Sequence, residues 1–160
     1  MDEPVPIRRA AVGCLLIALA GLAVALIVRP AIFSFAPPRD DSAVVVATAA
    51  DVVDGPVKRD VLLTRSYGWP GEIDAGDGRV QLSVIVAPGA FAGVTAVAAS
   101  SPLSDDCPLE IAQVGLVDCE GRAWTLDGVP LESGLPPLDR FPVDVAGGSV
   151  TVDLTRTIGD

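Results

Sequence analysis

The pattern of apolar and polar positions divides the chain into two unlike parts. Residues 10–28 form a run of nineteen residues without a charged side chain, and the nine residues before it include Arg8 and Arg9. A helix of about 20 apolar residues spans a hydrocarbon core of roughly 30 Å. We therefore predict a short tail over 1–9 and a transmembrane helix over 10–28, embedded in the lipid bilayer.

The same run is also a candidate for a cleaved leader, because a basic tail before apolar residues begins a signal peptide as well. The apolar core of such a leader has about 7–15 residues, which is shorter than this run. The run continues past Arg29-Pro30 without a prompt small-residue cleavage site. These features favour an uncleaved signal-anchor.

One side of the predicted helix carries small residues at alternating spacings of three and four positions. These residues are Ala11, Cys14, Ala18, Gly21 and Ala25. Small residues at this spacing let a second helix approach closely within a membrane. We predict a packing face for a membrane-protein partner or a second copy of the chain, although an alanine-rich span also produces such a stripe by chance.

Beyond the span the pattern changes to short valine-rich runs separated by Gly, Pro and Asp. Residues 29–42, which contain Pro37-Pro38, are predicted as a juxtamembrane linker. From 79 to 86, Val80, Leu82 and Val84 alternate with mostly polar residues, as a half-buried strand requires, with Ile85 as the exception. Asp77-Gly78 before this run is a pair typical of tight turns.

The remaining runs complete an all-β pattern over 43–160. The expected strands are 43–48, 59–64, 79–86, 94–97, 110–118, 122–126, 129–131, 141–145 and 149–155. Residues 51–56 are expected to form a turn, and no second amphipathic helix is expected. We therefore predict one N-terminal transmembrane helix followed by a small antiparallel sandwich or barrel of about seven to nine short strands.

The charge and composition of the chain argue against several classes of function. The chain has 11 basic and 21 acidic residues, a net charge of −10, and no histidine. An acidic domain is a poor match for nucleic acid, which requires clustered Lys and Arg. Without histidine, Ser-His-Asp and Cys-His catalysis and histidine-ligated zinc are excluded. Asp74 and Asp77 lack the further oxygen ligands of a calcium loop. We predict no catalytic, cofactor-binding or metal-binding residues, and a protein that is not an enzyme.

Two cysteines, Cys107 and Cys119, lie outside the predicted span. Such a pair in an extracytoplasmic domain indicates a disulfide, with two free thiols as the alternative. A straight strand over 110–118 would hold the two Cα atoms more than about 7 Å apart, beyond bridging distance. A disulfide therefore requires this segment to bend or turn back.

The segment around Tyr67 and Trp69 is the most aromatic stretch of the predicted domain. Tyr and Trp dominate binding hot spots, so these two residues are candidates for a partner contact. The alternative, which we favour, is a loop whose Trp closes one end of the domain.

Basic residues flank both ends of the span in nearly equal number, so the short tail and the cysteine pair decide the expected orientation. We predict a cell-membrane protein with a cytoplasmic N-terminus and an extracytoplasmic C-terminal domain. Its expected function is that of a non-enzymatic accessory or assembly subunit of a membrane complex. The alternative is a tethered or secreted extracytoplasmic module that binds a ligand or is a small enzyme.

Overall fold

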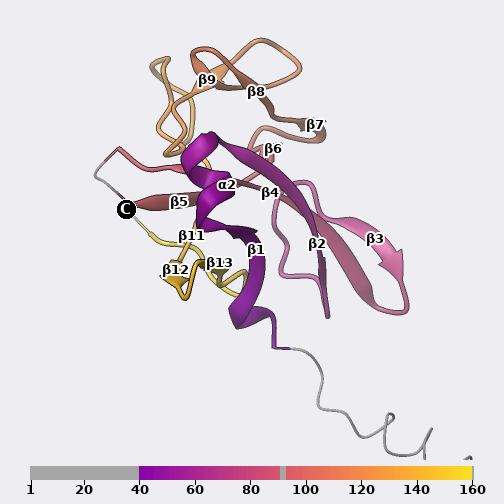
Figure 1. Ribbon diagram of the computed structural model, residues 1–160. Helices are drawn as coiled ribbons and strands as arrows, with labels where there is room; N and C mark the ends of the chain where they lie inside the picture. The colour runs from indigo at the N-terminus through magenta and orange to yellow at the C-terminus, as the bar shows by residue number, and fades with distance from the viewer. Residues whose placement is uncertain (1–39, 91–92, 160) are drawn as a thin grey trace, which may run out of the picture. The chain divides into compact units, whose positions relative to one another are not determined.

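The computed structural model describes residues 40–90 and 93–159 (Figure 1), which belong to one unit, Arg39–Asp160. The predicted tail, the predicted span with its small-residue face, and the linker up to residue 39 lie outside the described residues. Among the described residues, no helix has the length and apolar character needed to cross a membrane.

The described part of the chain is an all-β domain with several antiparallel sheets, as the valine-rich pattern predicts. The elements in the first half are η1 (Asp41–Ala43), β1 (Val44–Thr48), α2 (Ala49–Asp54), β2 (Val57–Leu63), β3 (Ile73–Gly76), β4 (Arg79–Pro88) and β5 (Val94–Ala98). Those in the second half are β6 (Ser100–Ser101), β7 (Ser104–Pro108), β8 (Glu110–Ala112), β9 (Gly115–Val117), β10 (Ala123–Trp124), β11 (Arg140–Phe141), β12 (Val143–Ala146) and β13 (Ser149–Val152). The strands are more numerous than expected, because β3, β6 and β7 lie where no strand was expected and the 110–118 run is divided into β8 and β9. The expected strand 129–131 is not formed; that segment makes an isolated bridge between Pro130 and Trp124.

Strand β4 is the centre of the largest sheet. One of its edges pairs with β2, and its other edge is shared by β3 near its start and β5 near its end, with β11 beyond β5. Asp77 and Gly78, both with positive φ, form the two-residue connection from β3 to β4. The expected tight turn at this pair is therefore confirmed.

A second sheet has the order β1-β13-β12. The main apolar core lies between this sheet, α2 and one face of the central sheet. From the central sheet it takes Val61, Leu63, Leu82, Val84, Val86, Ala96, Ala98 and Phe141, and from the rest of the domain Val46, Ala47, Val52, Val150, Val152 and Leu154.

The position of Ile85 explains why it interrupts the alternation in β4. Ile85 and Val97 point to the opposite face of the central sheet, where they contact a second core that includes Leu109, Leu116 and Trp124. This second core is covered by the small sheet β10-β9-β8. The last half of β4 is thus buried on both faces.

Two further expectations for local structure need correction. Residues 51–56 were expected to form a turn, but Ala49–Asp54 is a short helix with a capping box, in which Thr48 and Asp51 bond each other's backbone N–H. Residues 110–118 were expected to form one strand, but β8 and β9 form a hairpin there. The hairpin supplies the reversal that a Cys107–Cys119 bridge requires.

Candidate functional site: a groove between two strand edges

Strands β1 and β2 border a groove of about 620 Å³ that opens on the surface of the domain. This volume lies within the range of small-molecule and peptide pockets, about 300–1,000 Å³. Its lining comprises Asp40, Asp41, residues 43–46 and residues 59–62. Each strand is the edge of its own sheet, since β2 pairs only with β4 and β1 pairs only with β13 among the described residues.

The register of the central sheet shows which backbone groups of β2 face the groove. The Ala99 N–H donates to the Ser83 carbonyl at 2.9 Å, so the backbone groups of Ser83 point toward β5. Asp60, directly opposite Ser83 on β2, is therefore in a non-hydrogen-bonded pair, and its N–H and C=O point away from β4. By alternation the same holds for Leu62, so both residues present free strand-edge groups to the groove.

The opposite wall of the groove is β1, which pairs irregularly with β13 and runs antiparallel to β2. A β-bulge between Val45 and Ala47 shifts the pairing of β1 with β13. Figure 1 shows β1 rising into α2 and β2 descending from it, so the two strands run in opposite directions. The groove is consequently a seam between two sheets whose facing edges are not joined.

Asp41 closes one end of the seam. Its carboxylate accepts hydrogen bonds from the Thr64 N–H at 3.1 Å, the Thr64 hydroxyl at 2.7 Å and the Tyr67 hydroxyl at 3.0 Å. The Asp41 carbonyl accepts from the Leu154 N–H at 3.2 Å. These bonds satisfy a residue that is only 3% exposed, and they fix the start of the domain to both sheets.

The two faces of the seam differ in chemistry. On the inner face, Val46 and Val61 belong to the main core and are each 7% exposed at the groove. Val45 and Leu62, which are 64% and 48% exposed, add apolar surface at the rim. Arg59, which alternates with Val61 along β2, also lines the groove and adds a cation there.

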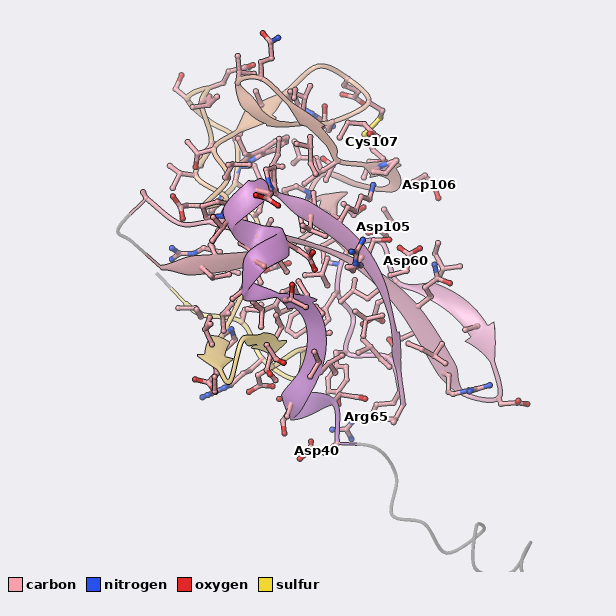
Figure 2. All side chains as sticks on the ribbon, in the orientation of Figure 1. Asp40, Asp60, Arg65, Asp105, Asp106 and Cys107 are labelled. Carbon is pink, nitrogen blue, oxygen red and sulfur yellow. A yellow bond between two sulfur atoms is a disulfide. The ribbon has the colours of Figure 1, made fainter. Side chains whose placement is uncertain are left out.

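On the other face of β2, Asp60 alternates with Lys58 and Leu62, so this face carries both charges and an apolar side chain. Asp60 accepts a hydrogen bond from the Ser83 hydroxyl, and Ser83 lines a neighbouring pocket of about 310 Å³ together with Glu72, Asp105 and Asp106. Figure 2 shows the labelled Asp60, Asp105 and Asp106 side chains on this part of the domain. The lining of this pocket includes no Lys or Arg.

The predicted contact residues Tyr67 and Trp69 are half-buried and pack against the main core. Trp69 donates its indole N–H to the Leu154 carbonyl at 2.9 Å and meets Phe141 edge-on, while Tyr67 bonds Asp41. Their loop is held by Glu72, whose carboxylate accepts from Ser66 and from the backbone N–H of Tyr67. Burial alone would raise the pKa of Glu72, but these hydrogen bonds outweigh it and lower the pKa.

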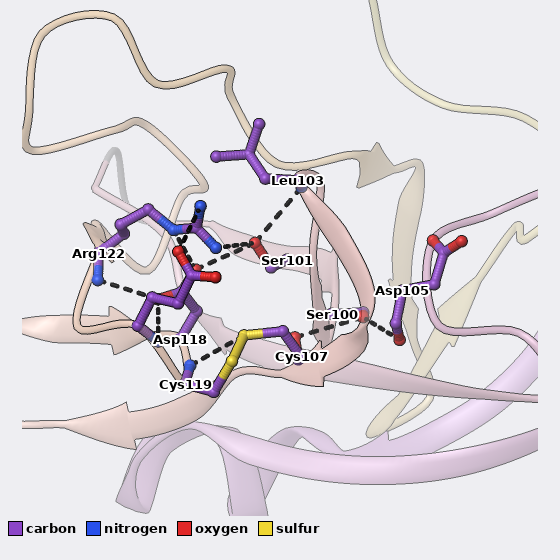
Figure 3. The surroundings of a disulfide bond; sticks show 9 residues. Ser100, Ser101, Leu103, Asp105, Cys107, Asp118, Cys119 and Arg122 are labelled. Atoms are coloured by element: carbon purple, nitrogen blue, oxygen red, sulfur yellow. Dashed lines mark hydrogen bonds and ion pairs between the residues drawn. A yellow bond between two sulfur atoms is a disulfide. The ribbon is translucent and has the colours of Figure 1, made fainter.

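Cys107 and Cys119 form a disulfide with a Cα–Cα distance of 5.5 Å, the bond expected of the cysteine pair outside the predicted span (Figure 3). The Cys119 N–H donates to the Cys107 sulfur at 3.0 Å. The bridge fastens the end of β7 to the turn that follows β9, and Cys107 itself is 1% exposed.

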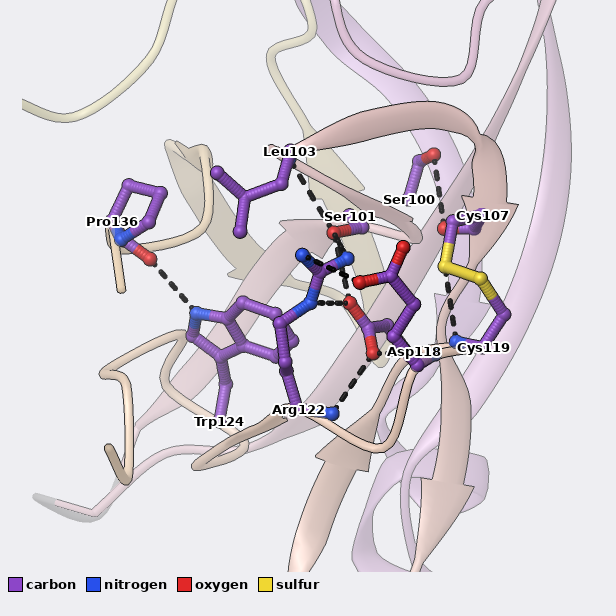
Figure 4. Close-up of polar contacts among 10 residues, drawn as sticks. Ser100, Ser101, Leu103, Cys107, Asp118, Cys119, Arg122, Trp124 and Pro136 are labelled. Carbon is purple, nitrogen blue, oxygen red and sulfur yellow. Dashed lines mark hydrogen bonds and ion pairs between the residues drawn. A yellow bond between two sulfur atoms is a disulfide. The ribbon is translucent and has the colours of Figure 1, made fainter. Parts of the chain in front are cut away.

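Beside the disulfide lies a buried polar network that sequence reasoning did not identify (Figure 4). Arg122 Nε donates to the Asp118 carboxylate at 2.6 Å, and the Ser101 hydroxyl donates to the same group at 3.1 Å. Burial favours a higher pKa for Asp118, but the bonds from Arg122, Glu120 and Ser101 lower it. Ser101, Asp118 and Arg122 are bonded to one another, so the network organises the turn after β9.

No group of three or more Cys, Asp or Glu side chains is arranged to hold a metal ion in residues 40–90 and 93–159. Asp74 accepts from the Gly76 N–H at 2.8 Å, and Asp77 lies 3.7 Å from Arg79. Both are therefore used in the β3–β4 turn.

The seam was missed at the level of sequence because β1 and β2 carry the same valine-rich pattern as interior strands. The charged pair Arg59-Asp60 in β2 was the available signal, since charged residues are typical of edge strands.

Comparison with known proteins assigns no family or function to the chain. No protein-family model matches it, and no curated protein matches its sequence.

Proposed function

We propose that this protein is a membrane-anchored, non-enzymatic accessory subunit whose extracytoplasmic β-domain binds another protein. The observation that supports it most directly is the seam between β1 and β2, which begins at Asp40, where the described domain starts. In this proposal residues 10–28 anchor the chain in the bilayer and the domain, a small antiparallel sandwich, is held outside.

The sequence contains no histidine, which removes histidine-based catalysis and is in keeping with a binding role. The small-residue face of the predicted helix supplies a second contact, within the membrane. Binding at two points on one chain raises the effective concentration of each contact for the other.

Affinity purification of the tagged full-length protein in mild detergent tests the proposal, with mass spectrometry of the bait and of co-purifying chains. We expect one membrane protein at a constant ratio to the bait, and an intact bait mass. A matched variant with Gly21→Leu and Ala18→Leu obstructs the helix face and is expected to lower recovery. A bait that is recovered alone, or that lacks its first residues, would contradict the proposal.

A further inference from the structure

The two halves of the Cys107–Cys119 disulfide lie in very different surroundings. Cys119 is exposed, in the turn that follows β9, whereas Cys107, near the end of β7, is 1% exposed. The bridge therefore reaches the surface through one cysteine and the interior through the other. Access is one of the factors that decide which sulfur of a disulfide an external thiol attacks.

We propose that this disulfide is a redox switch, which a dithiol opens by attack on the Cys119 sulfur, and that opening it loosens the β8–β9 hairpin without unfolding the domain. The inference goes beyond the proposed function and does not depend on it. It specifies the site of reaction, the chemical class of the co-reactant and the element that responds.

The position of the bridge selects Cys119 as the sulfur that is attacked. Disulfide exchange proceeds through a mixed disulfide, and the attacking thiolate lies in line with the bond that breaks. Attack on Cys119 therefore comes from the side opposite the buried Cys107, which is the solvent side. Attack on Cys107 would require the reductant to approach from within the domain.

The reaction balances in two steps. The electron pair of the first thiolate forms an S–S bond to Cys119, and the old bond breaks with its pair on Cys107, which takes a proton from water. The second thiol of the reductant loses its proton, attacks the mixed disulfide and releases Cys119 as a thiolate, which is protonated in turn. The dithiol is oxidised to a disulfide, and the protein disulfide is reduced to two thiols.

A hydrogen bond favours Cys107 as the sulfur that leaves. The backbone N–H of Cys119 donates to the Cys107 sulfur at 3.0 Å (Figure 3). A hydrogen bond becomes stronger when its acceptor is charged, so this N–H stabilises the Cys107 thiolate and offsets part of the cost of its burial.

Other contacts hold both ends of the hairpin when the bridge is open. Before β8, the Leu109 N–H donates to the Ala99 carbonyl at 2.9 Å, and the Leu109 carbonyl accepts from Lys58 Nζ at 3.0 Å. After β9, Arg122 Nε donates to Asp118 at 2.6 Å. The two thiols therefore stay near each other, so that oxidation closes the bond again, while the hairpin between these points loses its cross-link.

The hairpin forms part of an exposed apolar surface. Ile111 and Val114, which are 40% and 66% exposed, line a pocket of about 470 Å³ together with Pro56 and Pro88. Loosening the hairpin changes the shape of this surface, so the redox state of the bridge controls it.

Trapping of the mixed disulfide tests which sulfur is attacked. The full-length protein with Cys14→Ala, which removes the third cysteine, is treated with glutathione in mild detergent. At early times it is quenched with N-ethylmaleimide in denaturant, and its peptides are mapped by mass spectrometry. We expect glutathione on Cys119 and the maleimide on Cys107, in about tenfold excess over the reverse arrangement. Equal labelling, a majority of glutathione on Cys107, or reduction that occurs only in denaturant overturns the inference.

Hydrogen exchange of the same protein, before and after dithiothreitol, tests the response of the hairpin. We expect amides within 107–119 to exchange about tenfold faster after reduction, those of β4 to be unchanged, and re-oxidation to restore the slow rates. A variant that also carries Cys107→Ser and Cys119→Ser is the control, and it should exchange fast in this segment with or without dithiothreitol. Unchanged exchange of the hairpin, or faster exchange that extends to β4, overturns the inference.

Discussion

The buried carboxylate of Asp118 is a single side chain on which we expect the stability of the domain to depend. Its side chain is fully buried and meets Arg122, whose side chain is 19% exposed. Removing one member of such a pair leaves the other without its partner, and the loss exceeds that of a surface ion pair.

Asp118 gives a prediction for pH dependence. Because its pKa is lowered in the folded state, its contribution to stability is present above the unfolded value, near pH 4, and is lost as the pH falls through the folded pKa. We expect Asp118→Asn to lower the free energy of unfolding by roughly 2–3 kcal/mol at pH 7. The difference from wild type should shrink below about pH 4, where the protonated acid resembles the amide.

Urea unfolding of residues 39–160, followed by tryptophan fluorescence at several pH values, measures this difference. Glu132→Gln, at an exposed position, is the control and should change stability little at any pH. A difference between Asp118→Asn and wild type that stays constant down to pH 3 would be inconsistent with the lowered pKa.

At the scale of secondary-structure elements, the sequence predicts those strands and turns that are determined by a local residue pattern. The alternation of Val80, Leu82 and Val84 locates β4, and Asp77-Gly78 locates its turn. The helix α2 was missed because six residues are too few to show a helical period, although Thr48 and Asp51 already form a capping-box pattern.

Features that depend on tertiary neighbours were not predictable. The 110–118 run looks like one apolar strand, and only the disulfide geometry indicated that it reverses. For the seam, Arg59-Asp60 marked β2 as an edge strand, but no local pattern shows that the edge of β1 lies beside it. The role of Ile85 as a contact to a second core likewise follows only from the hairpin packed over it.

The β8–β9 hairpin supplies a prediction at this scale. Gly115 has φ of +133°, and a Cβ added there would lie 2.2 Å from the Trp124 carbonyl oxygen. We expect Gly115→Ala to lower the free energy of unfolding by about 2–4 kcal/mol, through backbone strain and this clash. Gly93→Ala, where an added Cβ meets nothing within 4 Å, is the matched control in the same urea experiment. Equal stabilities of the two variants would contradict the close approach of β9 and β10.

At the scale of the whole molecule, the described domain and the predicted anchor are separate parts of one chain. The described residues carry the acidic surface and the seam, whereas residues 10–28 carry the membrane prediction, which lies outside the described part. The two parts are therefore tested by different experiments.

Alkaline carbonate extraction tests the anchor. We expect the full-length protein to remain with the membrane pellet, because about 20 buried apolar residues resist extraction. A chain that starts at Asp40 should appear in the supernatant. Release of the full-length protein would contradict a spanning helix, and an intact mass that lacks the first residues would identify a cleaved leader.

The bonds of Asp41 have a mechanical consequence. If the first 39 residues are held in a membrane, any tension on the domain enters it at Asp40 and reaches Asp41 next. Asp41 is fastened to Thr64 after β2 and to Leu154 after β13, so the load is divided between the two sheets before β1 can be peeled away. Under such tension, the N-terminal end of the domain and the seam would keep their structure until the hydrogen bonds of Asp41 to Thr64 and Leu154 break.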